Sequence, residues 1–290
     1  MSEVQVAARR ENILGEGVCW EPLRGRVYWV DIKAGRIEWL EPASSAEGGW
    51  TLDLRPSAIA PLRDGRLLLG TDAGVVLFDP KTSAAEHKLV LEADRPDNRS
   101  NDGGADRQGR FWLGTMDDAG ARASGAVYRI DPDWSVTRVI DGLGIPNTLQ
   151  VSPDGRTLYL ADSRAQVIWA YDLEPGTGAL GYRRVFVDTK GSPASPDGSA
   201  VDVDGFLWNA QWGASRVVRY SPDGEVDRVI EMPVSQPTKC AFGGPDLDVL
   251  YITSAREGLA EAALAREPLA GSLFRLDPGV RGLAHTPFGG

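Results

Sequence analysis

The chain has 290 residues, a formal net charge of −10 and 42% hydrophobic residues. Excess negative charge disfavours binding to nucleic-acid phosphates or to an anionic membrane surface, and no stretch approaches the roughly 20 apolar residues of a transmembrane helix. We therefore expect no nucleic-acid and no membrane partner. Cys19 and Cys240 are too few for a disulfide framework, and no charged, apolar leader opens the sequence, so we expect a cytoplasmic protein.

A hairpin pattern recurs along the chain, with an apolar strand, a turn containing glycine and a second apolar strand. Successive turn glycines are 40, 44, 46 and 50 residues apart, at Gly25, Gly65, Gly109, Gly155 and Gly205. A looser sixth copy begins at Asp248, and each copy continues into a third strand. Short strands that repeat every 40 to 50 residues are typical of propeller blades. The sequence therefore predicts an all-β protein, a six-bladed β-propeller that occupies residues 1–290 as a single domain.

Two further segments complete this prediction. The sixth repeat lacks an obvious fourth strand, whereas Val4 to Ala8 is an unassigned run of alternating apolar residues. We expect this run to close the ring by supplying the outer strand of the last blade. Residues 259–270 are the one stretch with helical composition. A sandwich of two packed sheets is the alternative, but it does not require so regular a repeat.

Polar residues recur at one register before the turn glycines. They stand eight residues before four of the glycines and nine before Gly25, at Glu16, Ser57, Asn101, Asn147 and Asp197. In a propeller the residues that enter the innermost strands converge on one mouth of the central channel. Carboxylate and amide oxygens suit a hard divalent cation such as calcium, magnesium or manganese, with zinc possible. Single Asp and Asn residues are common turn formers, and it is their recurrence that favours ligands.

Long segments of the sequence resemble one known family. They are LGEGVCW from Leu14, RSNDGGADRQGRFWLGTM from Arg99, GLGIPNTLQVSPDGRTLYLADS from Gly142, SPDGSAVDVDGFLWNAQWG from Ser195 and KCAFGGPDLDVLYITSAREGL from Lys239. These segments are similar to those of the regucalcin, senescence-marker and gluconolactonase family. The resemblance implies a six-bladed propeller that holds one divalent metal ion and hydrolyses sugar-acid lactones. It also implies metal ligands at Glu16, Asn147 and Asp197, a general base at Asp197, and substrate contacts at Arg99 and Asn101.

The chain departs from the family pattern at two places. Many members have Gly after the ligand Asn, whereas this chain has Thr148, whose β-branched side chain should resist a positive φ. We therefore expect a different backbone there. Many members also carry a Glu in the loop after GTM, whereas this loop offers Asp117 and Asp118. A substrate contact is expected to be lost or replaced.

The residue types indicate a mechanism and leave alternatives open. A bound cation would polarise the lactone carbonyl, while Asp197 or a metal-bound hydroxide would activate the attacking water. The two histidines, His87 and His285, lie outside the register, which argues against a histidine base. We expect a monomer that binds a small-molecule sugar lactone. A metal-dependent organophosphate hydrolase, a non-enzymatic calcium-binding protein and a propeller interaction platform are the alternatives.

Several residues should surround the site. Loops that join the second and third strands of a blade lie on the same face as the channel mouth, because each strand reverses the chain. We expect residues 116–125 and 255–271 to form its walls. Asp162, Gln211 and Trp212 fall on the same rim, either as site residues or as capping and packing residues.

Overall fold

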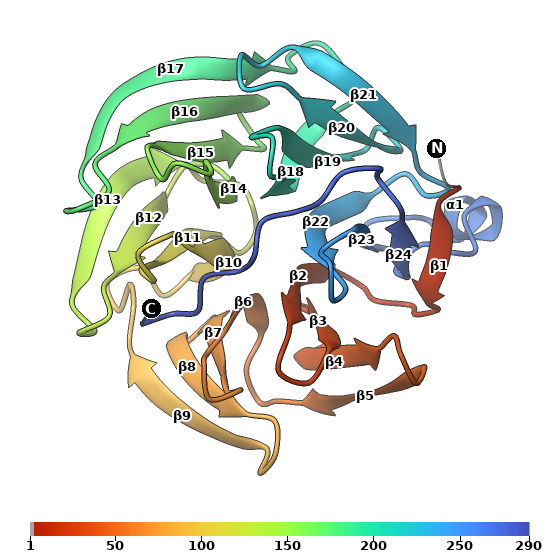
Figure 1. Cartoon of the computed structure of the whole chain (residues 1–290), viewed down its shortest axis with the longest axis horizontal. Coiled ribbons are helices and arrows are strands. Elements are labelled where there is room, and N and C mark those ends of the chain that lie inside the picture. Colours follow the sequence, from red (N-terminus) through yellow and green to blue (C-terminus); the bar gives the residue numbers. More distant parts are fainter. Residues whose placement is uncertain (1–2, 290) are drawn as a thin grey trace.

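The computed structural model describes residues 3–289 and contains six four-stranded sheets arranged in a ring around a central channel (Figure 1). Neighbouring strands pair antiparallel, and five of the sheets follow the sequence order from the channel outward. This is the six-bladed β-propeller that the hairpin repeat predicts. We number the blades one to six in the order of their inner strands.

Blades one to three are built from the first half of the chain. From the channel outward their strands are β2 (Gly15–Glu21), β3 (Arg26–Asp31), β4 (Arg36–Glu41) and β5 (Ala46–Thr51); β6 (Pro56–Pro61), β7 (Leu67–Thr71), β8 (Gly74–Asp79) and β9 (Ala84–Leu89); and β10 (Asn98–Ala105), β11 (Phe111–Asp117), β12 (Gly125–Ile130) and β13 (Val136–Leu143). The inner strands are buried along most of their length, whereas the outer strands β5 and β9 are largely exposed.

Blades four to six complete the ring. Their strands, again from the channel outward, are β14 (Pro146–Val151), β15 (Thr157–Asp162), β16 (Val167–Leu173) and β17 (Leu180–Asp188); β18 (Ser195–Val201), β19 (Leu207–Trp212), β20 (Arg216–Tyr220) and β21 (Val226–Glu231); and β22 (Pro237–Gly243), β23 (Val249–Ser254), β24 (Leu273–Leu276) and β1 (Gln5–Ala8). The last strand of blade six is thus the first strand of the chain.

The ring closes through this N-terminal strand, as expected from the sequence. In β1, Gln5 pairs with Arg275 and Val6 pairs with Phe274 in antiparallel register. The backbone N–H of Asn12 also donates to the carbonyl oxygen of Gly271 at 3.2 Å. Closure by strands from both ends of the chain leaves β24 paired on both sides, which removes one open sheet edge from blade six.

The predicted turns and core are present. The turn glycines Gly65, Gly109, Gly155 and Gly205 have φ between 73° and 83°, which is the left-handed region that glycine adopts without a steric cost. Trp112 and Trp208 are fully buried, and each indole N–H donates to an aspartate at the end of the preceding inner strand, at 2.9 Å. The polar atom of each of these two tryptophans is therefore satisfied within its own blade.

The helical prediction for residues 259–270 is correct in place and too long in extent. The helix α1 spans Glu261–Arg266. It ends there because Pro268 disfavours helical backbone at Glu267, whose φ and ψ are −119° and 62°. No helix within residues 3–289 is long and apolar enough to cross a bilayer.

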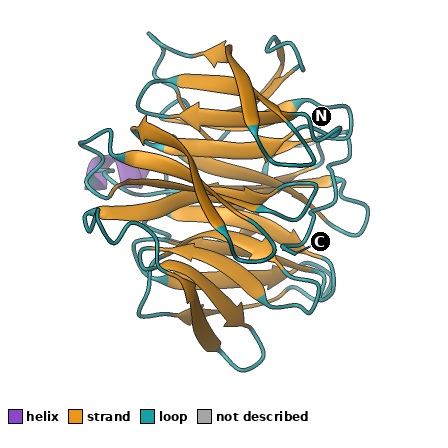
Figure 2. Ribbon diagram, turned by 90° about the vertical axis from the view of Figure 1, so that its left-hand side faces the viewer, coloured by secondary structure: helices purple, strands orange, loops and turns teal. Residues whose placement is uncertain are grey.

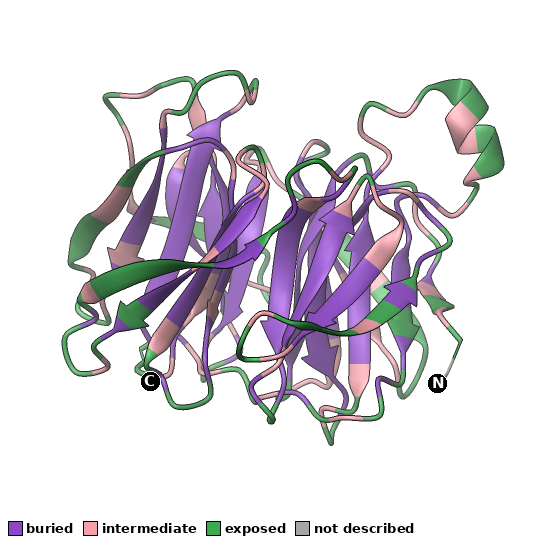
Figure 3. Ribbon diagram, turned by 90° about the horizontal axis from the view of Figure 1, so that it is seen from above, coloured by how far each residue is buried: buried purple, intermediate pink, exposed green. Residues whose placement is uncertain are grey.

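The two faces of the ring differ. The helix α1 projects from one face, and both chain termini lie on the opposite face (Figures 2 and 3). The C-terminal segment runs across the centre of that second face, from β24 towards β10 (Figure 1). Backbone hydrogen bonds fix it, from Val203 to the carbonyl oxygen of Arg281 at 3.0 Å and from Gly289 to that of Gly109 at 2.9 Å. One end of the channel is therefore covered by the chain itself.

Candidate active site

All six inner strands carry a pairing irregularity near the end where they enter the channel. A β-bulge places an extra residue in one strand and redirects the side chains around it. The pairing register breaks between Glu16 and Cys19, Pro56 and Ala58, Ser100 and Gly103, Asn147 and Gln150, Pro196 and Ser199, and Pro237 and Cys240. Each polar residue that the sequence spacing aligned lies at or within one of these breaks.

Four of the five aligned residues line one cavity of about 260 Å³ at this mouth, namely Glu16, Asn101, Asn147 and Asp197. Arg99 lines it as well. The rest of the wall comes from neighbouring strands and from the two loops expected to overhang the mouth: Leu14, Met116, Ile145, Ser163, Arg164, Ser195, Trp212 and Glu257. The cavity is small and has both polar and apolar lining residues, as is usual for a small-molecule site.

The fifth aligned residue, Ser57, does not reach the cavity. Its hydroxyl lies 2.7 Å from Ser100 Oγ and 3.4 Å from the carbonyl oxygen of Gly70. In blade six the equivalent Thr238 donates its hydroxyl hydrogen to the carbonyl oxygen of Gly15, in blade one. These two bulges therefore join neighbouring strands, whereas the bulges of blades one, three, four and five supply the cavity.

The two carboxylates of the site are buried without a cationic partner. Glu16 is 7% exposed and Asp197 is 6% exposed, and within residues 3–289 neither forms an ion pair. Burial raises the pKa of Glu16 to about 7, and the negative charge of Asp102 adds to this shift. Burial, together with the charges of Glu16 and Asp102, also holds the pKa of Asp197 well above its usual value. Such a pair favours a cation placed between them.

An amide network lines the same cavity as these carboxylates. Asn147 Nδ2 donates to Ser163 Oγ at 2.8 Å, and its Oδ1 accepts from Asn101 Nδ2 at 3.1 Å. Asn101 Oδ1 in turn accepts from an Nη1 hydrogen of Arg99 at 2.9 Å. Both amide groups are thus held in one orientation, and Asn147 Oδ1 is a neutral oxygen donor in the cavity that the two carboxylates also line.

The site offers a hard cation a suitable but small set of side chains. Among the described residues no cluster of three or more His, Cys, Asp or Glu residues could hold a metal ion. The mouth instead combines two buried carboxylates with one amide oxygen. Oxygen donors of this kind suit calcium, magnesium or manganese, which commonly keep further coordination positions for water or substrate. The residues present therefore fit one divalent ion.

The left-handed backbone at Thr148 contradicts the expectation that a β-branched residue would change the local conformation. Its φ is 56°, and the corresponding Gly17 in blade one has a φ of 61°. A non-glycine residue in this region costs on the order of 1–3 kcal/mol unless its surroundings hold it there. The Thr148 hydroxyl donates to the carbonyl oxygen of Asp197 and lies 2.9 Å from Ser199 Oγ. These contacts hold the strained residue and fix the position of Asn147 relative to Asp197.

Asp118, in the loop after Met116, binds two arginines and does not line the cavity. Its carboxylate accepts from Arg99 Nε and from Arg55 Nη1, both at 2.8 Å. Lys33 Nζ lies 3.6 Å from the same carboxylate. The loop therefore holds Arg99 through Asp118. Asp117 is buried and instead binds Arg122 and backbone N–H groups of its own loop.

The three rim residues have different roles. Trp212 lines the cavity. Asp162 caps backbone N–H groups and accepts from those of Gly144 and Arg164 at 2.8 and 3.0 Å. Gln211 is fully buried and donates to the Tyr220 hydroxyl at 2.7 Å. The capping and packing alternative is thus correct for two of them.

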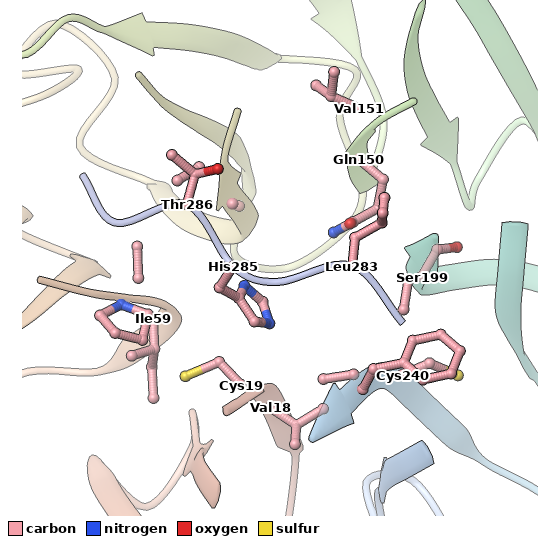
Figure 4. Close-up of a pocket in the computed structure, with 18 of the residues that line it drawn as sticks. Val18, Cys19, Ile59, Gln150, Val151, Ser199, Cys240, Leu283, His285 and Thr286 are labelled. Atoms are coloured by element: carbon pink, nitrogen blue, oxygen red, sulfur yellow. The ribbon is translucent and has the colours of Figure 1, made fainter. Parts of the chain in front are cut away.

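A buried ion pair closes the channel beyond the cavity. Asp102 in blade three binds Lys239 in blade six, and both side chains are at least 94% buried. Beyond them lies a second cavity of about 60 Å³, lined by Cys19, Cys240 and the C-terminal segment. Figure 4 shows His285 of that segment pointing into this second cavity. His285 is exposed to solvent and does not line the cavity that holds Glu16 and Asp197.

Comparison with known proteins places these features in a family. The family model described as the SMP-30/gluconolactonase/LRE-like region matches residues 14–256. The chain belongs to this family. The L-arabinolactonase of Azospirillum brasilense is 38% identical over 294 residues, which cover 99% of this chain and 96% of that protein. Pentonolactonase XacC of Haloferax volcanii is 39% identical over 280 residues, covering 93% and 92%.

The solved structures agree with the family membership. The chain is similar to the crystal structure of a calcium-binding protein, regucalcin, from Agrobacterium tumefaciens, with a TM-score of 0.95 and 34% identity. The match covers 98% of this chain and 96% of that chain. The expected family and fold are therefore confirmed.

Several residues at or near the site were not predicted from the sequence. Ser163 and Arg164 line the cavity, and Asp102 and Lys239 form a buried ion pair between blades three and six. A signal for the first two existed, since Ser163 and Arg164 directly follow the second strand of blade four and so must lie at the mouth. The pairing of Asp102 with Lys239 left no such signal, because their juxtaposition depends on how blades three and six face each other across the channel.

Proposed function

We propose that this protein hydrolyses a sugar-acid lactone, an aldonolactone, to the open-chain aldonic acid with the help of one divalent metal ion. The observation that carries the proposal is the convergence of Glu16, Asn147 and Asp197 in one cavity that Arg99 also lines. The lactonases among its relatives, which match almost the whole chain, support a lactone-hydrolysing enzyme. The regucalcin match favours a divalent ion.

The chain's own residues divide the work of binding and catalysis. Glu16, Asn147 and Asp197 would hold the ion, which when bound supplies a positive charge that polarises the lactone carbonyl. Arg99 Nη2 makes no hydrogen bond within residues 3–289 and is free to donate to a ring or hydroxyl oxygen of the substrate. Asn101 keeps Arg99 and Asn147 in register through hydrogen bonds of 2.9 and 3.1 Å.

Asp197 is the residue best placed to move the proton. Its carboxylate accepts a proton from water as the water oxygen forms a bond to the carbonyl carbon of the lactone. The bond between that carbon and the ring oxygen then breaks, and the proton passes to the ring oxygen, which becomes a hydroxyl group. The product is the open-chain acid. A positioned base of this kind typically contributes about 10²- to 10⁴-fold in rate.

The test is a panel of lactones assayed on chelated protein with single metal ions restored. Glucono-, galactono-, xylono- and arabinono-lactone are supplied in turn with calcium, zinc, manganese or magnesium, and hydrolysis is followed by the release of acid. We expect chelation to abolish hydrolysis and at least one ion to restore it. Full activity in metal-free protein would disprove the role of the metal. No activity on any lactone with any ion would disprove the lactonase function.

A further inference from the structure

One cationic side chain at the cavity wall has no role in the mechanism above. Arg164 lies in the turn between β15 and β16 and lines the same cavity as Glu16 and Asp197. Its backbone N–H is held by Asp162 Oδ1 at 3.0 Å, and its Nη1 donates to the carbonyl oxygen of Ala121. The residue is therefore held by its backbone and by Nη1, and its Nε and Nη2 groups make no hydrogen bond with residues 3–289.

The other cations around the mouth are paired with carboxylates. Arg99 binds Asp118 at 2.8 Å, and Lys33 binds Glu257 at 3.2 Å. Arg55, next to them, binds both Asp118 and Asp72. These pairs compensate the charges of Asp118, Glu257 and Asp72.

Arg164 forms no ion pair in the part of the chain that the structure describes. Glu257, the one other acidic residue of the cavity wall besides the two candidate metal ligands, is already paired with Lys33. In a chain with a net charge of −10, an unpaired arginine beside a substrate cavity is a distinctive feature. Its charge and its free donors are available to a ligand.

We propose that Arg164 forms a subsite for an anionic group carried by the substrate at the end remote from the lactone carbonyl. The inference rests on the proposed lactonase function and narrows the substrate class to lactones with a carboxylate, sulfonate or phosphate substituent. The place of Arg164 supports the remote position, because it follows β15, one strand further from the channel axis than β14, which carries Asn147. A planar guanidinium presents parallel N–H donors that match the two oxygens of such an anion.

The chemistry favours an anion over a neutral hydroxyl group at this position. Hydrogen bonds between charged groups are roughly twice as strong as those between neutral groups. When both partners are charged, as here, the site discriminates between substrates that differ only in this group.

The experiment compares lactones matched except at C6. Glucono-lactone carries a neutral hydroxymethyl group there, and its counterparts carry a carboxylate, a sulfonate or a phosphate. Wild-type protein, Arg164→Gln and Arg164→Lys are assayed with the same metal ion at saturation. Arg156→Gln, at the other end of β15 from Arg164, changes the net charge equally and serves as the matched control.

We expect wild-type kcat/KM to be highest for one of the anionic lactones. The preferred lactone shows which anionic group, carboxylate, sulfonate or phosphate, the subsite binds. Arg164→Gln should lower kcat/KM for that lactone by roughly 10- to 100-fold, mainly through KM, and by a much smaller factor for glucono-lactone. The kcat/KM of Arg164→Lys for that lactone should lie between those of wild type and Arg164→Gln, and Arg156→Gln should match wild type. Equal losses on neutral and anionic lactones would show that Arg164 only supports its loop and would overturn the inference.

A binding measurement separates this inference from the proposed function. Calorimetric titration with glucarate, an open-chain sugar diacid, needs no turnover. Weaker binding to Arg164→Gln than to wild type supports the subsite even if no lactone is hydrolysed. Equal binding to the two proteins overturns the subsite even if lactones are hydrolysed.

Discussion

Blades two and five carry the same bulge at the same register, yet their polar residues behave differently. Ser57 of blade two is buried and satisfied, with Ser100 Oγ at 2.7 Å. Asp197 of blade five is buried too, but among residues 3–289 its carboxylate has only the backbone N–H of Gly198 as a hydrogen-bond donor, and it faces the like charges of Glu16 and Asp102. The bulge therefore determines where a side chain lies. The hydrogen-bond partners of that side chain determine whether it links neighbouring strands or is left available to bind a ligand.

Substitution of both residues is the strongest test of this contrast. Asp197→Asn keeps the size of the side chain and removes its charge and its basicity, so we expect lactone hydrolysis to fall by roughly 10²- to 10⁴-fold and metal affinity to weaken. Ser57→Ala should cost much less. Both are measured as kcat/KM at saturating metal, with circular dichroism to confirm the fold. Equal losses in both variants would mean that the register reports blade stability and not chemistry.

The Asp102–Lys239 pair occupies the next positions in the bulges of blades three and six. It tests the same contrast through stability, because here a buried carboxylate does have a cationic partner. Lys239→Met leaves Asp102 buried without its partner, so we expect the free energy of unfolding to fall by about 3–5 kcal/mol. Urea denaturation of metal-free protein measures the loss. In the double variant Asp102→Asn, Lys239→Met no charge is stranded, and much of the loss should be recovered. A single variant as stable as wild type would show that water reaches the pair.

Asp118 provides a smaller and more local test. Asp118→Asn removes the charge that holds Arg99, and because charged hydrogen bonds are worth about 1.5–3 kcal/mol, KM should rise by about tenfold or more. The value of kcat should change less, since Asp118 does not line the cavity. Asp72→Asn is the matched control, because Asp72 binds Arg55 at 2.9 Å and does not bind Arg99. An equal rise of KM in both variants would assign the effect to Arg55 or to the loop.

Much of the candidate site could be predicted because it follows from local geometry. The spacing to the turn glycines fixes which residue enters each inner strand, and four of the five aligned residues reach the cavity. The exception, Ser57, could not be recognised from spacing, since its hydroxyl is taken by Ser100 in the neighbouring blade. The conformation of Thr148 was predicted wrongly for a related reason. Its hydrogen bond to the carbonyl oxygen of Asp197 crosses from blade four to blade five.

The sequence by itself determined the repeat, the six blades, the closing strand β1 and the mouth at which the polar residues gather. Strand alternation, turn glycines and spacing are local properties, and a propeller repeats them with little variation. The tertiary structure alone decided which of those residues are paired. The pairing of Asp102 with Lys239 and the unpaired charge of Arg164 depend on distances between blades that are far apart in the sequence. A charge is compensated by the groups that surround it in space, and only closure of the ring brings those groups together.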